Sequence, residues 1–157
     1  MPSRIVRTPA QMDMLTRFLS TLKLPLTVEW VQGMDRTGQQ NRLQWLWAGE
    51  VAEQVGDRSA ADIQAEWKLD HGCPIMREDS AEFRAAYDAM VAPLPRHGQI
   101  ILMRDLDMGV TRLMKVRQMV RYMDTIQRAC LDMGFELTEP DPELADYQRR
   151  YRTKDKK

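Results

Sequence analysis

The feature that most constrains the fold is a long amphipathic pattern at residues 111–133, which predicts one long helix. Apolar side chains recur on one face when residues step by about 100°. They are Val116, Met119, Val120, Met123, Ile126, Cys130 and Met133. Arg117, Arg121 and Arg128 lie on the opposite face, and Gly134 follows as a helix terminator. The apolar stripe is wider than a small sheet requires, so other surfaces must cover it.

The remaining patterns predict an α+β fold that is mostly helical and contains a small sheet of short strands. Further helices are indicated by capping residues followed by apolar residues at helical spacing. They begin near residues 9, 37, 59, 79 and 142, with Thr8 and Ser59 among the capping residues. Gly56 and residues 71–74 are expected to end two of them. Short runs rich in β-branched or aromatic residues predict the strands. These strands cover residues 4–8, 24–32 and 99–103.

The segment MDRTGQQNRLQWLW, residues 34–47, predicts a helix start followed by an apolar face. Thr37 and Gln40 have the spacing of a capping box. The helical pattern turns Asn41 and Gln44 inward, with the tryptophans, and turns Arg42 outward. We therefore expect the amides to fix the local backbone and Arg42 to remain available for a ligand.

Length and charge describe one domain with a basic end. The 157 residues carry 23 basic and 23 acidic side chains, so the net charge is zero and the chain is not a uniformly basic nucleic-acid binder. Residues 148–157 alone have a net charge of +5. We expect a domain at residues 1–140 and a short C-terminal helix with a basic tail at residues 141–157. The tail and the arginine stripe are either solvated surface or phosphate contacts.

Cysteine and histidine usage gives no support for a metal site or a cofactor. Cys73 and Cys130 are far apart in sequence, and neither lies in a Cys-x-x-Cys or His-x-x-x-His pattern. The sequence shows no pattern of a signal peptide and no apolar run of membrane-spanning length. We therefore expect a protein of the reducing cytoplasm with two free thiols, no metal, no cofactor and no membrane partner.

One pair of residues is a candidate for catalysis. Asp105 and Asp107 would share a face if the strand at 99–103 continued, and paired carboxylates can hold Mg²⁺ for phosphodiester cleavage. A turn rich in aspartate explains the same residues. There is no Gly-x-Ser-x-Gly pattern and no Gly-rich phosphate loop. A metal-dependent nuclease therefore stays as an alternative, beside a protein-only adaptor.

Two stretches resemble the NinB/Orf family of phage recombination mediators. The first is LTVEWVQGMDRTGQQNRLQWLWAGEVAEQV, residues 26–55, and the second is ILMRDLDMGVTRLMKVRQMVRYMDTIQRACLDMGFEL, residues 101–137. The resemblance covers about residues 4–140. The sequence departs from the family pattern at the turn in the second stretch. Two or three serine or threonine residues are expected there, and only Thr111 is present.

The resemblance implies a non-enzymatic protein of the bacterial host cytoplasm that binds single-stranded DNA without sequence preference. The resemblance also implies an intertwined homodimer. Such a dimer would associate with single-stranded-DNA-binding protein and help load a recombinase or annealing protein. Because of the resemblance, we expect the arginine face of the long helix and the basic tail to contact DNA. The expected DNA-binding residues are Arg36, Arg42, Arg112, Lys115, Arg117, Arg121, Arg149, Arg150 and Arg152. No catalytic residue is expected.

Overall fold

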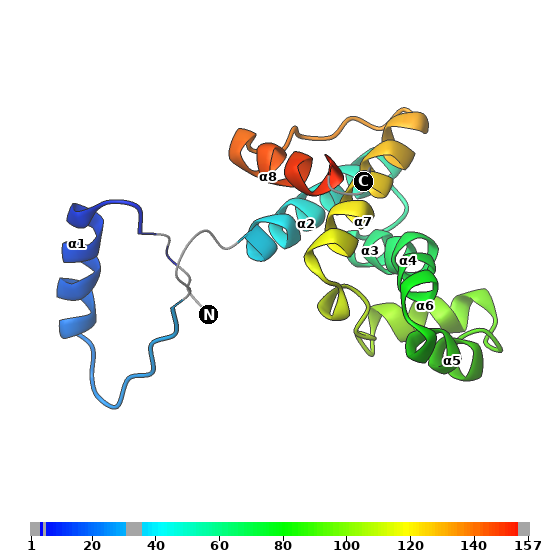
Figure 1. The fold of residues 1–157 in the computed structure, drawn as a ribbon, viewed down its shortest axis with the longest axis horizontal. Helices are drawn as coiled ribbons and strands as arrows, with labels where there is room; N and C mark the ends of the chain where they lie inside the picture. Colours follow the sequence, from blue (N-terminus) through cyan, green and yellow to red (C-terminus); the bar gives the residue numbers. More distant parts are fainter. Residues whose placement is uncertain (1–3, 5, 31–35, 154–157) are drawn as a thin grey trace. The chain divides into compact units, whose positions relative to one another are not determined.

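All the regular secondary structure in the described part of the chain is helical. The computed structural model describes residues 4, 6–30 and 36–153 (Figure 1). The helices are α1 (Pro9–Ser20), α2 (Arg36–Val55), α3 (Ala60–Trp67), η1 (Lys68–Gly72), α4 (Cys73–Asp79), α5 (Ala81–Met90), α6 (Arg96–Arg104), η2 (Thr111–Leu113), α7 (Val116–Asp132) and α8 (Pro142–Thr153). The chain divides into two units, Met1–Met34 and Asp35–Lys157.

The prediction of an α+β fold with a small sheet is wrong. Residues 99–103 lie inside α6, and the described residues of 4–8 and 24–32 form no strand. A short apolar run fits a helix as well as a strand. In α6 the spacing of three between Ile100 and Met103 points both side chains toward the core, while Ile101 between them is exposed. Residues 5, 31 and 32 of the predicted strands lie outside the described residues.

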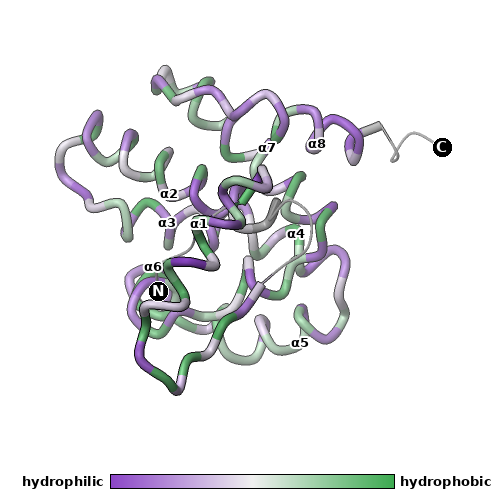
Figure 2. Tube along the Cα trace, turned by 90° about the vertical axis from the view of Figure 1, so that its left-hand side faces the viewer, coloured by the Kyte–Doolittle hydropathy of each residue, from purple (hydrophilic) through white to green (hydrophobic). Residues whose placement is uncertain are grey.

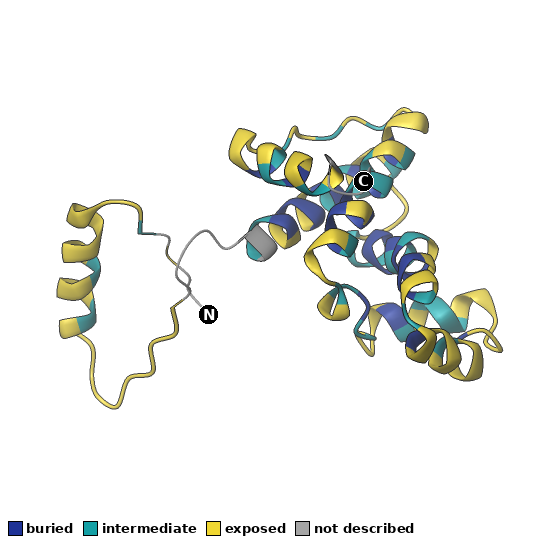
Figure 3. Ribbon diagram, viewed as in Figure 1, coloured by how far each residue is buried: buried dark blue, intermediate teal, exposed yellow. Residues whose placement is uncertain are grey.

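In its described residues, 4 and 6–30, the first unit contains α1 and a following segment without regular secondary structure. Thr8 caps α1 by accepting the backbone N–H of Gln11, and Pro9 occupies the first helical position. None of the residues of α1 is buried. Most of the described residues of this unit are exposed (Figure 3), and they include large apolar residues. They are Met12, Met14, Phe18, Leu22, Leu24, Leu26, Val28 and Trp30.

The second unit holds two hydrophobic cores. The first core lies between α2, α3, α7 and α8, and its largest fully buried side chains are Trp47, Tyr122, Met123 and Ile126. The second lies between α3, η1, α4, α5 and α6 and includes Phe83. Apolar and polar residues alternate along these helices (Figure 2). Because α3 contributes to both cores, the two parts of this unit are packed on a shared helix.

A buried polar network replaces part of the first core. Gln44 donates through Nε2 to Gln64 Oε1 and to Tyr122 Oη, each at 2.8 Å. The inward orientation predicted for Gln44 is confirmed. Asn41 is exposed instead, because the buried face of α2 follows Gln40, Gln44 and Trp47, and Asn41 is turned about 100° away from Gln40. Thr37 lies within the helix, which begins at Arg36. The side chain of Thr37 lies outside the described residues, and Gln40 is buried rather than placed at the helix end.

The chain after α7 is fixed along one face of α2. Trp47 Nε1 donates to the carbonyl of Thr138 at 2.7 Å, and the Glu50 carboxylate accepts the backbone N–H and the hydroxyl of Thr138. Gln54 donates to the Glu136 carbonyl and accepts from its N–H. The spacing of Trp47, Glu50 and Gln54 places all three on one side of the helix. These bonds lead the chain to α8, whose Leu144 is buried in the first core.

A close approach at Gly72 joins the connection after α6 to the helical body. A Cβ added at Gly72 would lie 2.9 Å from Val110 Cγ1 and 3.4 Å from Tyr122 Cε2. Val110 and Tyr122 are fully buried, so neither side chain can move aside easily. Gly72 therefore permits the contact that sets the position of residues 110–114.

Replacing Gly72 by alanine is expected to lower the free energy of unfolding by about 1–3 kcal/mol, because the added methyl group overpacks this contact. The matched control is Gly49→Ala in α2, where an added Cβ meets no atom within 4 Å. Alanine should stabilise that helix by roughly 0.5–1 kcal/mol. Urea unfolding of both variants measures the two changes, and equal midpoints for G72A and G49A would contradict the close approach.

Candidate nucleic-acid interface

The nine residues expected to contact DNA lie on α2, η2, α7 and α8, with Lys115 just before α7. Arg42 is exposed on α2, and the side chain of Arg36 lies outside the described residues. The other seven form two groups, which are Arg112, Lys115, Arg117 and Arg121 at η2 and the start of α7, and Arg149, Arg150 and Arg152 on α8. The first group is contiguous along the chain and is exposed throughout, so the structure brings four of the expected residues onto one short segment.

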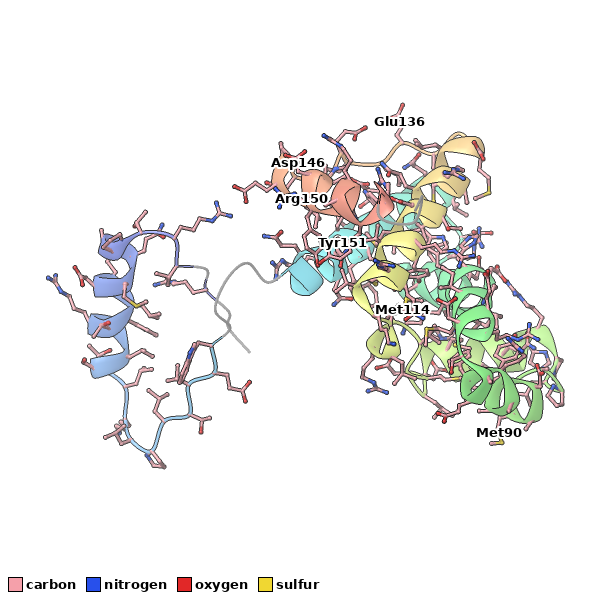
Figure 4. All side chains as sticks on the ribbon, viewed as in Figure 1. Met90, Met114, Glu136, Asp146, Arg150 and Tyr151 are labelled. Carbon is pink, nitrogen blue, oxygen red and sulfur yellow. The ribbon has the colours of Figure 1, made fainter. Side chains whose placement is uncertain are left out.

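This segment, residues 110–121, crosses from one core to the other and is held by buried contacts. Val110 belongs to the second core, Met119 belongs to the first, and Met114 between them packs against both (Figure 4). The backbone N–H of Lys115 donates to Gln118 Oε1 at 2.7 Å, which closes the start of α7. The cationic side chains therefore project from a backbone that is fixed on both sides.

A shallow hollow lies where α7 begins. Its volume is about 530 Å³, and Asp79, Lys115, Val116, Arg117 and Gln118 line it. The side chain of Gln118 donates to Asp79 Oδ2 at 3.0 Å, so α4 and α7 meet at its edge. Asp79 and Gln118 were not predicted as site residues, because they come from two helices that are far apart in the sequence and no local pattern relates them.

The cations of this segment differ in their partners. Arg121 forms an ion pair with Glu78 at 2.6 Å, and both side chains are more than half exposed. No carboxylate of the described residues forms an ion pair with Arg112 or Lys115. Arg112 lies against the backbone of Gly109, where an added Cβ would meet its Nη2 at 2.6 Å. Both side chains are exposed to solvent, although the pKa of the nearby Asp107 carboxyl group is lowered by Lys68 and, to a smaller extent, by the charge of Arg112.

The arginines of α8 are involved in contacts with acidic residues. Arg152 donates through two nitrogens to the Asp124 carboxylate of α7, which raises the pKa of Arg152. Arg149 pairs with Asp146 at 3.1 Å within the helix. Arg150 is exposed on the same helix (Figure 4). The pair with Asp124 links the end of α8 to the middle of α7, so this group has a structural contact as well as a positive charge.

The two aspartates considered for metal binding are not arranged as a pair. Asp105 follows the last residue of α6 and binds Arg104, while Asp107 binds Lys68 at 2.9 Å. These hydrogen bonds lower the pKa of both carboxyl groups. The predicted strand that would have aligned them is part of a helix. Among the described residues, no group of three His, Cys, Asp or Glu side chains could hold a metal ion.

The two cysteines are buried, separate and poorly suited to nucleophilic chemistry. Burial raises the pKa of the Cys73 thiol to about 12 and that of Cys130 to about 11. A thiol with such a pKa is protonated at neutral pH, and the thiolate is the reactive form. Cys73 lies in the second core and Cys130 in the first, so both act as small apolar side chains.

Comparisons with models of known protein families, with curated proteins and with solved structures found no match. Across the residues that the structure describes, none of the helices combines the length and the apolar character needed to cross a membrane.

Proposed function

We propose that this protein binds single-stranded DNA without sequence preference and acts as a recombination mediator. It would help load a recombinase or annealing protein onto strands coated by single-stranded-DNA-binding protein. The observation that carries the proposal is an exposed cationic segment, in which Lys115 and Arg117 line the hollow at the start of α7 and Arg112 is exposed three residues before Lys115. Exposed lysine and arginine side chains on a fixed backbone suit phosphate contacts, which position a strand without reading its sequence.

The resemblance of residues 26–55 and 101–137 to the NinB/Orf family supports the same function. The second stretch contains the whole cationic segment. A chain with zero net charge must gather its cations locally to bind DNA, and residues 112–121 do so with four basic side chains. Binding, rather than catalysis, is therefore the activity proposed for this surface.

The first unit supports the homodimer that belongs to this proposal. Phe18 is 53% exposed and Trp30 is 83% exposed, and α1 buries no residue. A segment with so little burial does not offset the entropy lost when it becomes ordered. A second copy of the chain would cover these apolar side chains. Light scattering should then give the mass of two chains, whereas one chain at micromolar concentration would contradict the homodimer.

The proposed function is tested by binding labelled DNA to the full chain, with and without Mg²⁺. Single strands, duplexes and junctions of equal length separate the possible substrates. We expect retention of the single strand at low salt and an intact strand in the presence of Mg²⁺. Cleavage would favour a nuclease, and capture of single-stranded-DNA-binding protein without any DNA retention would favour a protein-only adaptor. Either result would overturn the proposal.

A further inference from the structure

Two apolar side chains interrupt the cationic segment on its exposed side. Leu113 is 59% exposed and Val116 is 37% exposed. Both are neighbours in sequence of the basic residues Arg112, Lys115 and Arg117. A surface that only neutralises phosphates has no need of exposed apolar groups, because their hydration is unfavourable. The mixture therefore indicates a ligand with an apolar surface close to its negative charges.

Single-stranded DNA has this combination. Its phosphates carry the charge, and its unpaired bases have apolar faces that a duplex hides by stacking. In the hollow, Val116 supplies an apolar side chain between Lys115 and Arg117. The face of a base can lie on Val116 while the adjoining phosphates lie near the cations. The same hollow offers a duplex only the contacts to its phosphates.

The acidic residue in the hollow favours contact with a base over contact with a phosphate. Asp79 lines the hollow, and its Oδ2 already accepts from Gln118. A carboxylate repels a phosphate but accepts hydrogen bonds from the amino and imino groups at the edge of an unpaired base. Asp79 therefore disfavours a phosphate at its side of the hollow and suits the edge of a base.

The exposed groups are also held in place before any ligand binds. Val110 is buried against Gly72, Met114 packs on both cores, and Gln118 accepts the N–H of Lys115. A fixed backbone reduces the conformational entropy that binding would remove. Leu113 and Val116 are thus presented by a rigid turn rather than by a loose loop.

We propose that the hollow at the start of α7 receives an unpaired base, with Val116 of its lining against the face of the base and the neighbouring phosphates on Arg112, Lys115 and Arg117. The exposed Leu113, three residues earlier in the chain, would extend this apolar surface outside the hollow. This inference rests on the proposed function and adds a reason for preferring single strands to duplexes. The preference comes from apolar contact with the base, whereas the cations alone would bind both forms of DNA.

The test combines a double variant with a strand that lacks bases. Leu113→Gln with Val116→Gln removes the apolar surface and leaves every charge in place. The control is Leu131→Gln with Met133→Gln at the other end of α7, where the side chains are 56% and 65% exposed. Fluorescence anisotropy at fixed salt measures the dissociation constants for a single strand, for a duplex and for a strand of abasic sites with the same phosphates.

We expect the double variant to bind the single strand about three- to tenfold more weakly and the duplex unchanged. The original chain should lose a similar factor on the abasic strand, where the double variant should lose nothing further. Unchanged affinity of the double variant for the single strand, with salt-sensitive binding retained, would overturn the base site and leave the proposed function standing. Absence of binding by the original chain to every strand would overturn both.

Discussion

Replacing Trp47 by alanine is expected to lower the free energy of unfolding by about 3–5 kcal/mol, because it opens a large cavity in the first core. Trp47 is 1% exposed, and its Nε1 is the donor to the Thr138 carbonyl. The substitution therefore removes both a core side chain and one of the bonds that lead the chain to α8. Chemical denaturation followed by circular dichroism measures this loss.

The control for this prediction is two residues away on the same helix. Trp45 is 47% exposed, so Trp45→Ala removes a ring of the same size from the surface. We expect that variant to lose less than about 1 kcal/mol. Similar losses for W45A and W47A would contradict the orientation of α2 and with it the whole arrangement of the first core.

Replacing Arg112 and Lys115 together by alanine is expected to weaken binding of single-stranded DNA by about tenfold or more at low salt. Each side chain that contacts a phosphate releases counterions on binding, so its loss lowers both the affinity and the salt dependence. Neither side chain is buried, so the variant should unfold at the same denaturant concentration as the original chain. Anisotropy titrations at two salt concentrations measure both effects.

Arg128→Ala is the control for the single variants Arg112→Ala and Lys115→Ala. Arg128 is also exposed and lies near the opposite end of α7, so the control removes one charge from the same element. We expect its effect on affinity to be within about twofold, since it lies outside the cationic segment. An equal loss for R128A and K115A would mean that overall charge, rather than this segment, governs binding.

The sequence predicted some helix ends and missed others. The single helix predicted at residues 111–133 is wrong at its start, because the separate turn η2 precedes α7, which begins at Val116. The caps at Thr8 and Ser59 and the stops at Gly56 and Gly134 are confirmed, because each depends on local hydrogen bonds or on a positive φ. Residues 71–74 were expected to end a helix. The chain instead continues from α3 through η1 into α4. Gly72 in η1 packs closely there on Val110 and Tyr122, which are distant in sequence, so no local pattern indicates the contact.

The burial of side chains could be predicted from the sequence only in part. The apolar stripe predicted for α7 is buried at Met119, Met123 and Ile126, but Val116 and Met133 at its two ends are exposed. On α2 the prediction placed all the apolar residues together, yet Trp45 is exposed and Trp47 is buried. The two side chains differ by about 200° around the helix, so they cannot face the same core. The polar Gln44 occupies the buried face because Gln64 and Tyr122 supply its partners.

The candidate site was also predictable only in the parts that depend on residues close together in the sequence. The basic residues of α7 follow one another in the sequence, so their grouping could be predicted without a structure. The ion pairs of Arg121 with Glu78 and of Arg152 with Asp124 join separate elements, and no local pattern indicates them. The hollow beside Asp79 likewise exists only because α4 lies against the start of α7.

The central claim is that the cationic segment binds the phosphates of a single strand, and a salt titration of the unaltered chain tests it most directly. For three phosphate contacts, the logarithm of the binding constant should fall against the logarithm of the salt concentration with a slope of about −2. The variant lacking Arg112 and Lys115 should reduce that slope to roughly −1. A flat profile for the unaltered chain, or the same slope for both proteins, would contradict the account.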